Sequence, residues 1–151
     1  MTEEFQEEIL EINQVYAHSI RVGNYCIING RPCKVTQVYQ TGTATTDKVN
    51  LFGTDIFTGG KYNSVYSSNI MVSSPVVRFC DYTLIEIVDD IWVTLESFDG
   101  TILCDVKMPE DATLVSMIKD IHTGGGKVII KVMSTMGESM IVSAQESSAN
   151  E

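Results

Sequence analysis

The sequence predicts an all-β protein with two small β-barrel domains and one short helix. From Tyr25 onward, the 151-residue chain is rich in β-branched and aromatic residues, which favour strands. Turn residues interrupt these stretches about every 8–12 residues, a spacing that is typical of sandwiches and barrels. With 44% hydrophobic and 20% charged residues, the composition lies in the globular range. A length of 151 residues suits one domain or two small ones, so the pattern of strands and turns must decide the number of domains.

Five strands are predicted in the first half of the chain. Their ranges are Tyr25–Ile28, Cys33–Gln40, Lys48–Asp55, Lys61–Ser67 and Val76–Phe79. The breaks between the first four contain glycine, which adopts backbone angles that β-branched residues resist. These breaks are Asn29-Gly30, Thr41-Gly42 and Thr58-Gly59-Gly60. The first half is therefore expected to form one β unit.

A second run of strands begins at Tyr82. It reads YTLIEIVDD, IWVTLES and, after a turn at Phe98-Asp99-Gly100, TILCDVK. An approximate helical stripe then stops at a run of three glycines, and it consists of Leu114, Val115, Met117, Ile118 and Ile121. The closing strands are expected at Lys127–Ser134 and Ser139–Ala144. Three strands, a helix and two strands are the order of a five-stranded barrel of the OB type.

The predicted domain organisation has four parts. Residues 1–20 form an acidic amino-terminal tail, 21–79 the first barrel, 80–146 the OB-fold domain and 147–151 a polar tail. Five glutamates in the tail have no basic partner before His18: Glu3, Glu4, Glu7, Glu8 and Glu11. Terminal blocks of like charge are usually solvated. The alternative is an acidic helix that docks on a protein partner, because Phe5, Ile9 and Ile12 have near-helical spacing.

The formal net charge of −10 limits the function classes. Strong non-specific nucleic-acid binding is disfavoured, and a phosphate-binding surface would have to be a local patch. The cysteines form no CxxC pair, so reduced, half-buried thiols are expected rather than disulfides or a zinc site; they are Cys26, Cys33, Cys80 and Cys104. Because no apolar run approaches the ~20 residues that span a bilayer, no membrane contact is expected. Without a recognisable leader, a cytoplasmic location is expected.

Signatures of enzymes are absent from the sequence. It contains no GxSxG, P-loop or HExxH pattern. The only histidines are His18 and His122, and the second is interpreted as an ordinary residue at the end of the predicted helix. We therefore predict no enzyme activity, no cofactor and no metal site.

Three conspicuous features have structural interpretations. Asp89-Asp90 is interpreted as a hairpin turn, because adjacent residues on a strand point to opposite faces. The glycines Gly124–Gly126 follow the predicted helix, which indicates a helix end rather than a phosphate-binding loop. Trp92 lies among apolar neighbours and is expected in the core.

Several strings of the sequence occur together in one known family. In the first half they are Arg21-Val22-Gly23, Gly30-Arg31-Pro32-Cys33-Lys34 and Asp55-Ile56-Phe57-Thr58-Gly59-Gly60-Lys61-Tyr62. In the second half they are Asp81-Tyr82-x-Leu84-Ile85-x-Ile87, Met108-Pro109-Glu110 and Ser134-Thr135-Met136-Gly137-Glu138. From about Arg21 to Ala144, the chain resembles the eukaryotic translation initiation factor 5A family in the order and spacing of these strings.

The resemblance implies an SH3-like barrel followed by an OB-fold. Members of the family are understood to bind the ribosome near its exit site and to relieve stalled peptide-bond formation. Their active element is a hairpin loop of the form T-G-K-H-G-H-A-K, in which the first lysine is converted to hypusine. The long hypusine arm reaches toward the end of the peptidyl-transfer RNA. The implied function is therefore that of a ribosome-binding factor in translation elongation.

The corresponding loop departs from this pattern. It reads Thr41-Gly42-Thr43-Ala44-Thr45-Thr46-Asp47-Lys48. Thr43 takes the place of the modified lysine, and a threonine hydroxyl cannot replace the primary ε-amine that hypusine requires. No lysine lies between Lys34 and Lys48, and Lys48 itself matches a lysine of the family's outgoing strand. We expect a loop that faces ribosomal RNA without hypusine and binds it more weakly, because positive charge is missing.

Other residues of the first domain receive roles from the resemblance alone. Arg31 and Lys34 are candidate phosphate contacts, and an ordinary surface role is the alternative for both. The Gly30-Arg31-Pro32 segment is interpreted as a corner between two strands, and Lys61 and Tyr62 as residues that follow a turn. Val22 replaces a basic residue that is common in the family, which also predicts weaker RNA binding.

Two functions remain open. The first is a diverged 5A-like translation factor that still binds the ribosome through its shape, and the retained frame of both domains suggests it. The second is a repurposed structural or adaptor subunit of a large assembly, which Thr43 suggests because the fold alone does not fix the function. An OB module that binds nucleic acid without the ribosome suits the fold but not the net charge.

Overall fold

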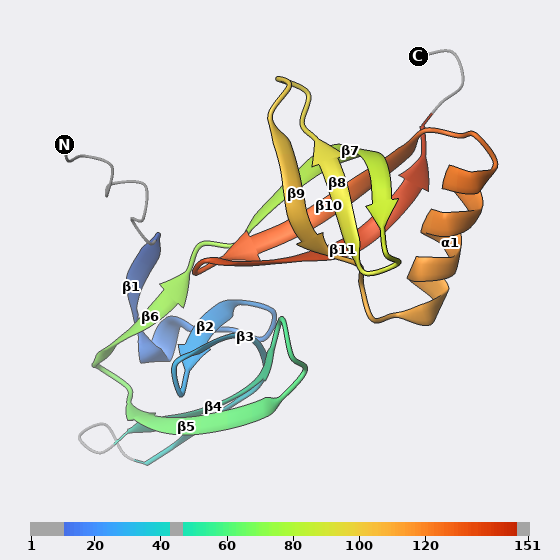
Figure 1. Cartoon of the computed structure of the whole chain (residues 1–151). Coiled ribbons are helices and arrows are strands. Elements are labelled where there is room, and N and C mark those ends of the chain that lie inside the picture. Colours follow the sequence, from blue (N-terminus) through green and yellow to red (C-terminus); the bar gives the residue numbers. More distant parts are fainter. Residues whose placement is uncertain (1–10, 43–46, 148–151) are drawn as a thin grey trace. The chain divides into compact units, whose positions relative to one another are not determined.

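The computed structural model divides into two compact units, which Figure 1 shows in sequence colours. The first unit contains Met1–Val77 and the turn Thr135–Glu138, and the second contains Arg78–Ser134 and Ser139–Glu151. The structure describes residues 11–42 and 47–147. Over these residues it consists of eleven strands, one 3-10 helix and one α-helix, which confirms the predicted all-β fold.

The first unit is built on a four-stranded antiparallel sheet. In spatial order its strands are β2 (Tyr25–Ile28), β3 (Arg31–Thr41), β4 (Lys48–Asp55) and β5 (Lys61–Ser67). The predicted bounds of β2, β4 and β5 are confirmed, and the predicted strand Cys33–Gln40 lies within β3. The β2–β3 turn uses Asn29 and Gly30, whose φ angles are +53° and +81°. A two-residue turn of this kind matches the right-handed twist of the strands that it joins.

The core of the first unit lies on one face of this sheet. Successive residues of β4 alternate between buried and half-buried or exposed positions, as period-two geometry requires. The buried cluster consists of Ala17, Ile20, Cys26, Ile28, Cys33, Val35, Val49, Leu51 and Val72. At Gly53 an added Cβ would lie 2.9 Å from Cys33 Cβ, so the packing at this point requires glycine.

The sequence had predicted a tail over residues 1–20. In the structure, residues 12–20 instead belong to the first unit. Strand β1 (Ile12–Tyr16) pairs antiparallel with β6 (Met71–Pro75), and a short 3-10 helix, η2 (Ala17–Ser19), follows. Ala17 is fully buried and Ile20 is 3% exposed. Burial of these apolar residues fixes the segment. The predicted acidic helix is wrong for Ile12, and the rest of it, with Phe5 and Ile9, lies outside the described residues.

The predicted strand Val76–Phe79 is confirmed only in its second half, because Arg78 and Phe79 lie in a strand and Val76 and Val77 do not. One strand, β6, ends at Pro75, and the next, β7, begins at Arg78. The backbone of Val76 bonds elsewhere in the first unit: its N–H donates to Glu11 O at 2.9 Å, and its carbonyl accepts from Thr135 Oγ1 at 2.8 Å. These bonds replace ladder pairing at this point.

The second unit contains a five-stranded sheet and the α-helix. The sheet order is β11 (Glu138–Glu146), β10 (Val128–Thr135), β7 (Arg78–Val88), β8 (Trp92–Glu96) and β9 (Ile102–Lys107). Helix α1 (Ala112–Thr123) lies between β9 and β10 in the chain, which is the predicted order. The buried core of the second unit consists of Leu84, Val93, Leu95, Val106, Met108, Ile118, Val128, Ile130, Val132 and Ile141. Of the predicted polar tail 147–151, only Ser147 is described.

The ends of α1 follow ordinary capping chemistry. Asp111 is the N-cap, and its side chain accepts hydrogen bonds from the N–H groups of Thr113 and Leu114. Gly124 is the C-cap, and His122 lies in the last turn. The prediction that the three glycines end the helix is confirmed.

Two predictions about the burial of side chains need correction, one for Trp92 and one for the cysteines. Asp89 and Asp90 form the expected turn, with φ angles of +57° and +60°. Trp92, however, is 41% exposed and not in the core, because its neighbour Val93 takes the inward position of β8. The cysteines are not uniformly half-buried either: two are buried and two are exposed, in the order Cys26, Cys33, Cys80 and Cys104.

One buried carboxylate organises the end of the first sheet. Asp55 is 2% exposed and accepts hydrogen bonds from Arg31 Nε at 2.5 Å and Arg31 Nη2 at 3.3 Å. Its Oδ1 also accepts from the N–H groups of Phe57, at 2.8 Å, and Thr58, at 3.2 Å. Burial alone would raise the pKa of Asp55, but these hydrogen bonds outweigh it and lower that pKa to about 2.

This network predicts an acid-dependent stability. The pKa of Asp55 is about 2 in the folded chain and near 3.8 in the unfolded chain. The ionised carboxylate therefore stabilises the folded state fully above about pH 4, and this stabilisation is lost as the pH falls toward 2. We expect Asp55→Asn to lower the unfolding free energy at pH 7. The difference in unfolding free energy between this variant and the unmodified chain should shrink by about 2 kcal/mol as the pH falls from 4 to 2.

Hydrogen exchange of peptides from β4 and β5, read by mass spectrometry, measures this difference in the first unit alone. Asp47→Asn is the matched control, because it removes a carboxylate from the same unit outside the Arg31 network. A constant difference between Asp55→Asn and the unmodified chain across this pH range would contradict the assignment.

Candidate functional site

The outer face of the β3–β4–β5 sheet carries four rows of side chains that point away from the core. In Figure 1 these three strands curve together along the first unit. The strand register places in one row Lys34 with Thr54 and Lys61, then Gln37 with Phe52 and Asn63, Tyr39 with Asn50 and Val65, and Thr41 with Lys48 and Ser67. We call these twelve residues the outer lysine face.

A β-bulge brings Lys34 and Tyr39 onto the same face. Regular alternation along β3 would put residues an odd number apart on opposite sides of the sheet. Between Val35 and Gln37 the register shifts, so Thr36 is the extra residue in this strand. The Thr36 hydroxyl donates to the carbonyl of Phe52 at 3.2 Å, which ties the bulge to β4.

The face is basic although the chain is acidic. Its lysines, Lys34, Lys48 and Lys61, are all exposed. Asp55 is the only acidic residue within β3, β4 and β5, all of which the structure describes, and it is buried on the other side of the sheet. The structure therefore contains the local positive patch that the net charge of −10 demands of any surface that binds phosphate.

Aromatic and amide groups lie between the lysines. Tyr39 is 51% exposed, and its ring meets Phe52 edge-on, with 5.7 Å between ring centres. Asn63 Nδ2 donates to Asn50 Oδ1 at 3.3 Å in the neighbouring strands. Exposed rings on a basic sheet are the elements that proteins use to stack unpaired bases, while lysines contact the phosphates.

The predicted RNA-facing loop leaves the sheet at the edge of this face. Thr41 and Lys48 form the last cross-strand pair, and Gly42 has a φ angle of +100°. On the return side, the Asp47 carbonyl accepts from Ser68 N at 3.1 Å. The four residues at its centre lie outside the described residues; they are Thr43, Ala44, Thr45 and Thr46.

The structure separates the two residues that the sequence had suggested as phosphate contacts. Lys34 lies on the outer lysine face. The guanidinium of Arg31 pairs with Asp55 and donates from Nη1 to Glu138 Oε2 at 2.7 Å. These carboxylates raise the pKa of Arg31 further above its ordinary value. Arg31 therefore has a structural role in the first unit, and its contact with phosphate stays a prediction.

Sequence reasoning missed part of the face. Lys61 was predicted to begin a strand after a turn and was given no contact role, whereas it points outward in the same row as Lys34. The rings of Tyr39 and Phe52 were not selected at all. Alternation along β4 could have found Phe52, but the bulge hides Tyr39 from any strict period-two pattern.

Other classes of site have little support in the described residues. They contain no group of three or more His, Cys, Asp or Glu side chains that could hold a metal ion. Among the same residues, no helix is long and apolar enough to cross a membrane. The outer lysine face and the hairpin at its edge therefore form the candidate site.

Comparison with known proteins identifies the family. Residues 12–70 match the family model described as translation initiation factor 5A-like, N-terminal. Residues 76–145 match the one described as eukaryotic elongation factor 5A hypusine, DNA-binding OB fold. The two models cover both halves of the chain in the order that the sequence predicts.

Individual relatives agree. Eukaryotic translation initiation factor 5A-4 of Solanum tuberosum is 39% identical over 127 residues, covering 83% of this chain and 80% of the relative. For factor 5A-3 of Arabidopsis thaliana the identity is 35% over 132 residues, covering 86% and 84%.

Solved structures show the same fold. A translation initiation factor eif-5a family protein from Naegleria fowleri has a TM-score of 0.79 and 32% identity, covering 89% of this chain and 98% of that one. Factor 5A from Methanococcus jannaschii, at 18% identity, has a TM-score of 0.68 and supports the fold alone, covering 90% and 98%. The two units therefore have the SH3-like and OB folds of these proteins, and the chain belongs to the eukaryotic translation initiation factor 5A family.

Proposed function

We propose that this chain binds the ribosome in the cytoplasm and acts in translation elongation without hypusine. Family membership supports the ribosome as the partner. The observation that carries the proposal is the outer lysine face. It combines three exposed lysines with the rings of Tyr39 and Phe52, on which bases could stack, and it contains no carboxylate. In this proposal, the face contacts ribosomal RNA.

The hairpin acts through its backbone and hydroxyl groups in this proposal. Thr43 stands where the family's modified lysine stands, and no other lysine occurs between Lys34 and Lys48. A hydroxyl has neither the nucleophilic amine nor the length that the modification needs. Because residues 41–46 are neutral and Asp47 is acidic, affinity for RNA depends on the three lysines of the face.

Replacing the two lysines at one end of the face tests the RNA contact. Lys34→Gln with Lys61→Gln removes two charges that share a cross-strand row. We expect less cosedimentation with ribosomes in low salt. The slope of log affinity against log salt concentration should fall by about 0.7 for each phosphate that is no longer neutralised.

The matched control is Lys107→Gln with Lys127→Gln. These lysines belong to the second unit, so the control has the same net charge as the test variant and leaves the face intact. Equal loss of ribosome binding in both double variants would indicate a general charge effect and would remove the face from the proposal.

The absence of hypusine is tested by the intact mass of the protein purified from its own cells. We expect the mass of the unmodified chain, because Thr43 offers no amine. Thr43→Lys, expressed in the same cells, provides the positive control for the modifying enzymes. A mass gain that matches hypusine on the natural chain, mapped to Lys48 or to any other residue, would overturn this part of the proposal.

The alternative function, a structural or adaptor subunit, is favoured by the same threonine. Affinity purification at low salt distinguishes the two, because the proposal expects ribosomal proteins as the main partners. Recovery of a different assembly, together with absence from ribosomal fractions, would favour the adaptor.

A further inference from the structure

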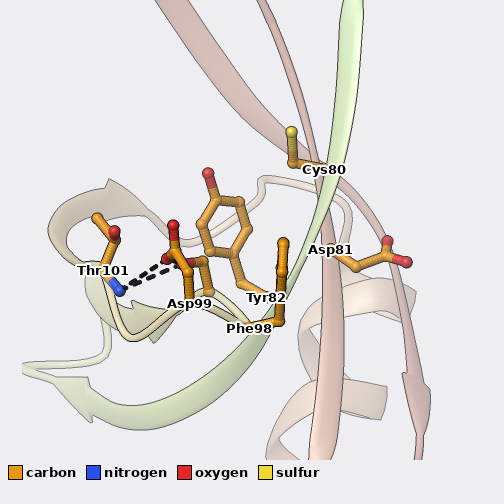
Figure 2. Close-up of a pocket in the computed structure, with 7 residues that line it drawn as sticks. Cys80, Asp81, Tyr82, Phe98, Asp99 and Thr101 are labelled. Atoms are coloured by element: carbon orange, nitrogen blue, oxygen red, sulfur yellow. Dashed lines mark hydrogen bonds between the residues drawn. The ribbon is translucent and has the colours of Figure 1, made fainter.

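A pocket of about 450 Å³ lies in the second unit and includes no residue of the outer lysine face. The first half of β7 and the turn between β8 and β9 form its walls. Figure 2 shows the ring of Tyr82 between the side chains of Phe98 and Asp99, with the Cys80 thiol at one side. Its volume is in the range of pockets that hold small ligands or single side chains.

A dense set of hydrogen bonds fixes the turn that carries Phe98. Ser97 N donates to Thr101 O at 2.8 Å, and Gly100 N donates to Ser97 O at 3.0 Å. Asp99 Oδ1 accepts from Thr101 N at 3.1 Å and from the Ser97 hydroxyl. Nevertheless Phe98 is fully exposed, at 101% of its reference area. The turn thus holds an aromatic ring in water beside a pocket.

The pocket is negatively charged and contains no cation of its own. None of its lining residues is basic, and the structure describes all of them. The Asp81 carboxylate points away from Tyr82 in Figure 2 and pairs with Lys131 at 3.3 Å, so its charge is already balanced. The hydrogen bonds from Ser97 and Thr101 lower the pKa of Asp99, which keeps that carboxylate ionised.

The aromatic walls suit the same kind of ligand. Burial raises the pKa of Tyr82, and the nearby Cys80 and Asp99 raise it further, so the phenol stays neutral. A neutral phenol and the ring of Phe98 both present electron-rich faces. Two such faces and an unbalanced carboxylate together attract a flat organic cation and repel a phosphate.

We propose that this pocket binds the guanidinium group of an arginine side chain in a basic segment of a partner protein. The planar guanidinium can stack on the rings of Tyr82 and Phe98 while its N–H groups reach the Asp99 carboxylate. This site uses no residue of the outer lysine face, so it stands whether or not that face binds RNA.

Binding of two fluorescein-labelled peptides to the full chain tests the site. Both peptides have a Gly-Ser backbone, and one carries two arginines where the other carries two citrullines, which are neutral and of similar shape. We expect the arginine peptide to bind and the citrulline peptide to bind at least about fivefold more weakly. Fluorescence anisotropy gives both affinities.

Variants of the turn locate the binding. Phe98→Ser should weaken binding of the arginine peptide about fivefold, and so should Asp99→Asn, which keeps an acceptor for Thr101 N. Asp105→Asn is the matched control, because it removes an exposed carboxylate outside the pocket and should leave the affinity unchanged.

The native cysteines give a second readout that needs no substitution. Cys80 lines the pocket and is exposed, Cys104 is exposed elsewhere, and Cys26 and Cys33 are buried. The arginine peptide should slow alkylation of Cys80 by iodoacetamide and leave the rate at Cys104 unchanged.

Each of four results would overturn the proposal: no binding of the arginine peptide, equal binding of the citrulline peptide, full binding by Phe98→Ser, or protection of Cys80 by a single-stranded oligonucleotide and not by the peptide. None of these outcomes depends on ribosome binding by the lysines of the first unit.

Discussion

The first unit depends on the ion pair between Arg31 and the buried carboxylate of Asp55. Asp55 ends β4, holds Arg31 at the start of β3, and fixes the turn into β5 through the N–H groups of Phe57 and Thr58. One side chain thus sets the ends of three neighbouring strands. Loss of Arg31 would leave a buried charge without its main partner, which is far more costly than loss of an exposed pair.

The same ion pair decides which cations remain for other partners. Arg31 lies at the β2–β3 corner, where a family resemblance suggests a phosphate contact, but two carboxylates occupy its guanidinium. Lys34 and Lys61 lie in one cross-strand row, on the side of the sheet without acidic residues. The inward carboxylate of Asp55 therefore stabilises the fold, whereas the outward amines of Lys34 and Lys61 remain available at the surface.

Sequence pattern predicted the parts of the fold that rest on local signals. The bounds of β4 and β5 follow from alternation and glycine turns, and the end of α1 follows from its glycines. Pairing between distant segments was not predictable in this way: β1 becomes a strand because β6 lies beside it, and β6 has two serines in five residues. The turn at Thr41-Gly42 was predicted from its glycine and its role from family resemblance, whereas the face beside it required the strand register.

Thr36 has a consequence for how this protein can change in length. Deleting Thr36 would remove the extra residue and restore strict alternation, so that Lys34 and Tyr39 would stay on the outer face and Val38 would still face the core. The deletion would also remove the hydrogen bond from the Thr36 hydroxyl to the carbonyl of Phe52. We therefore expect homologues to present the same surface either with this bulge or with one residue fewer between Lys34 and Tyr39.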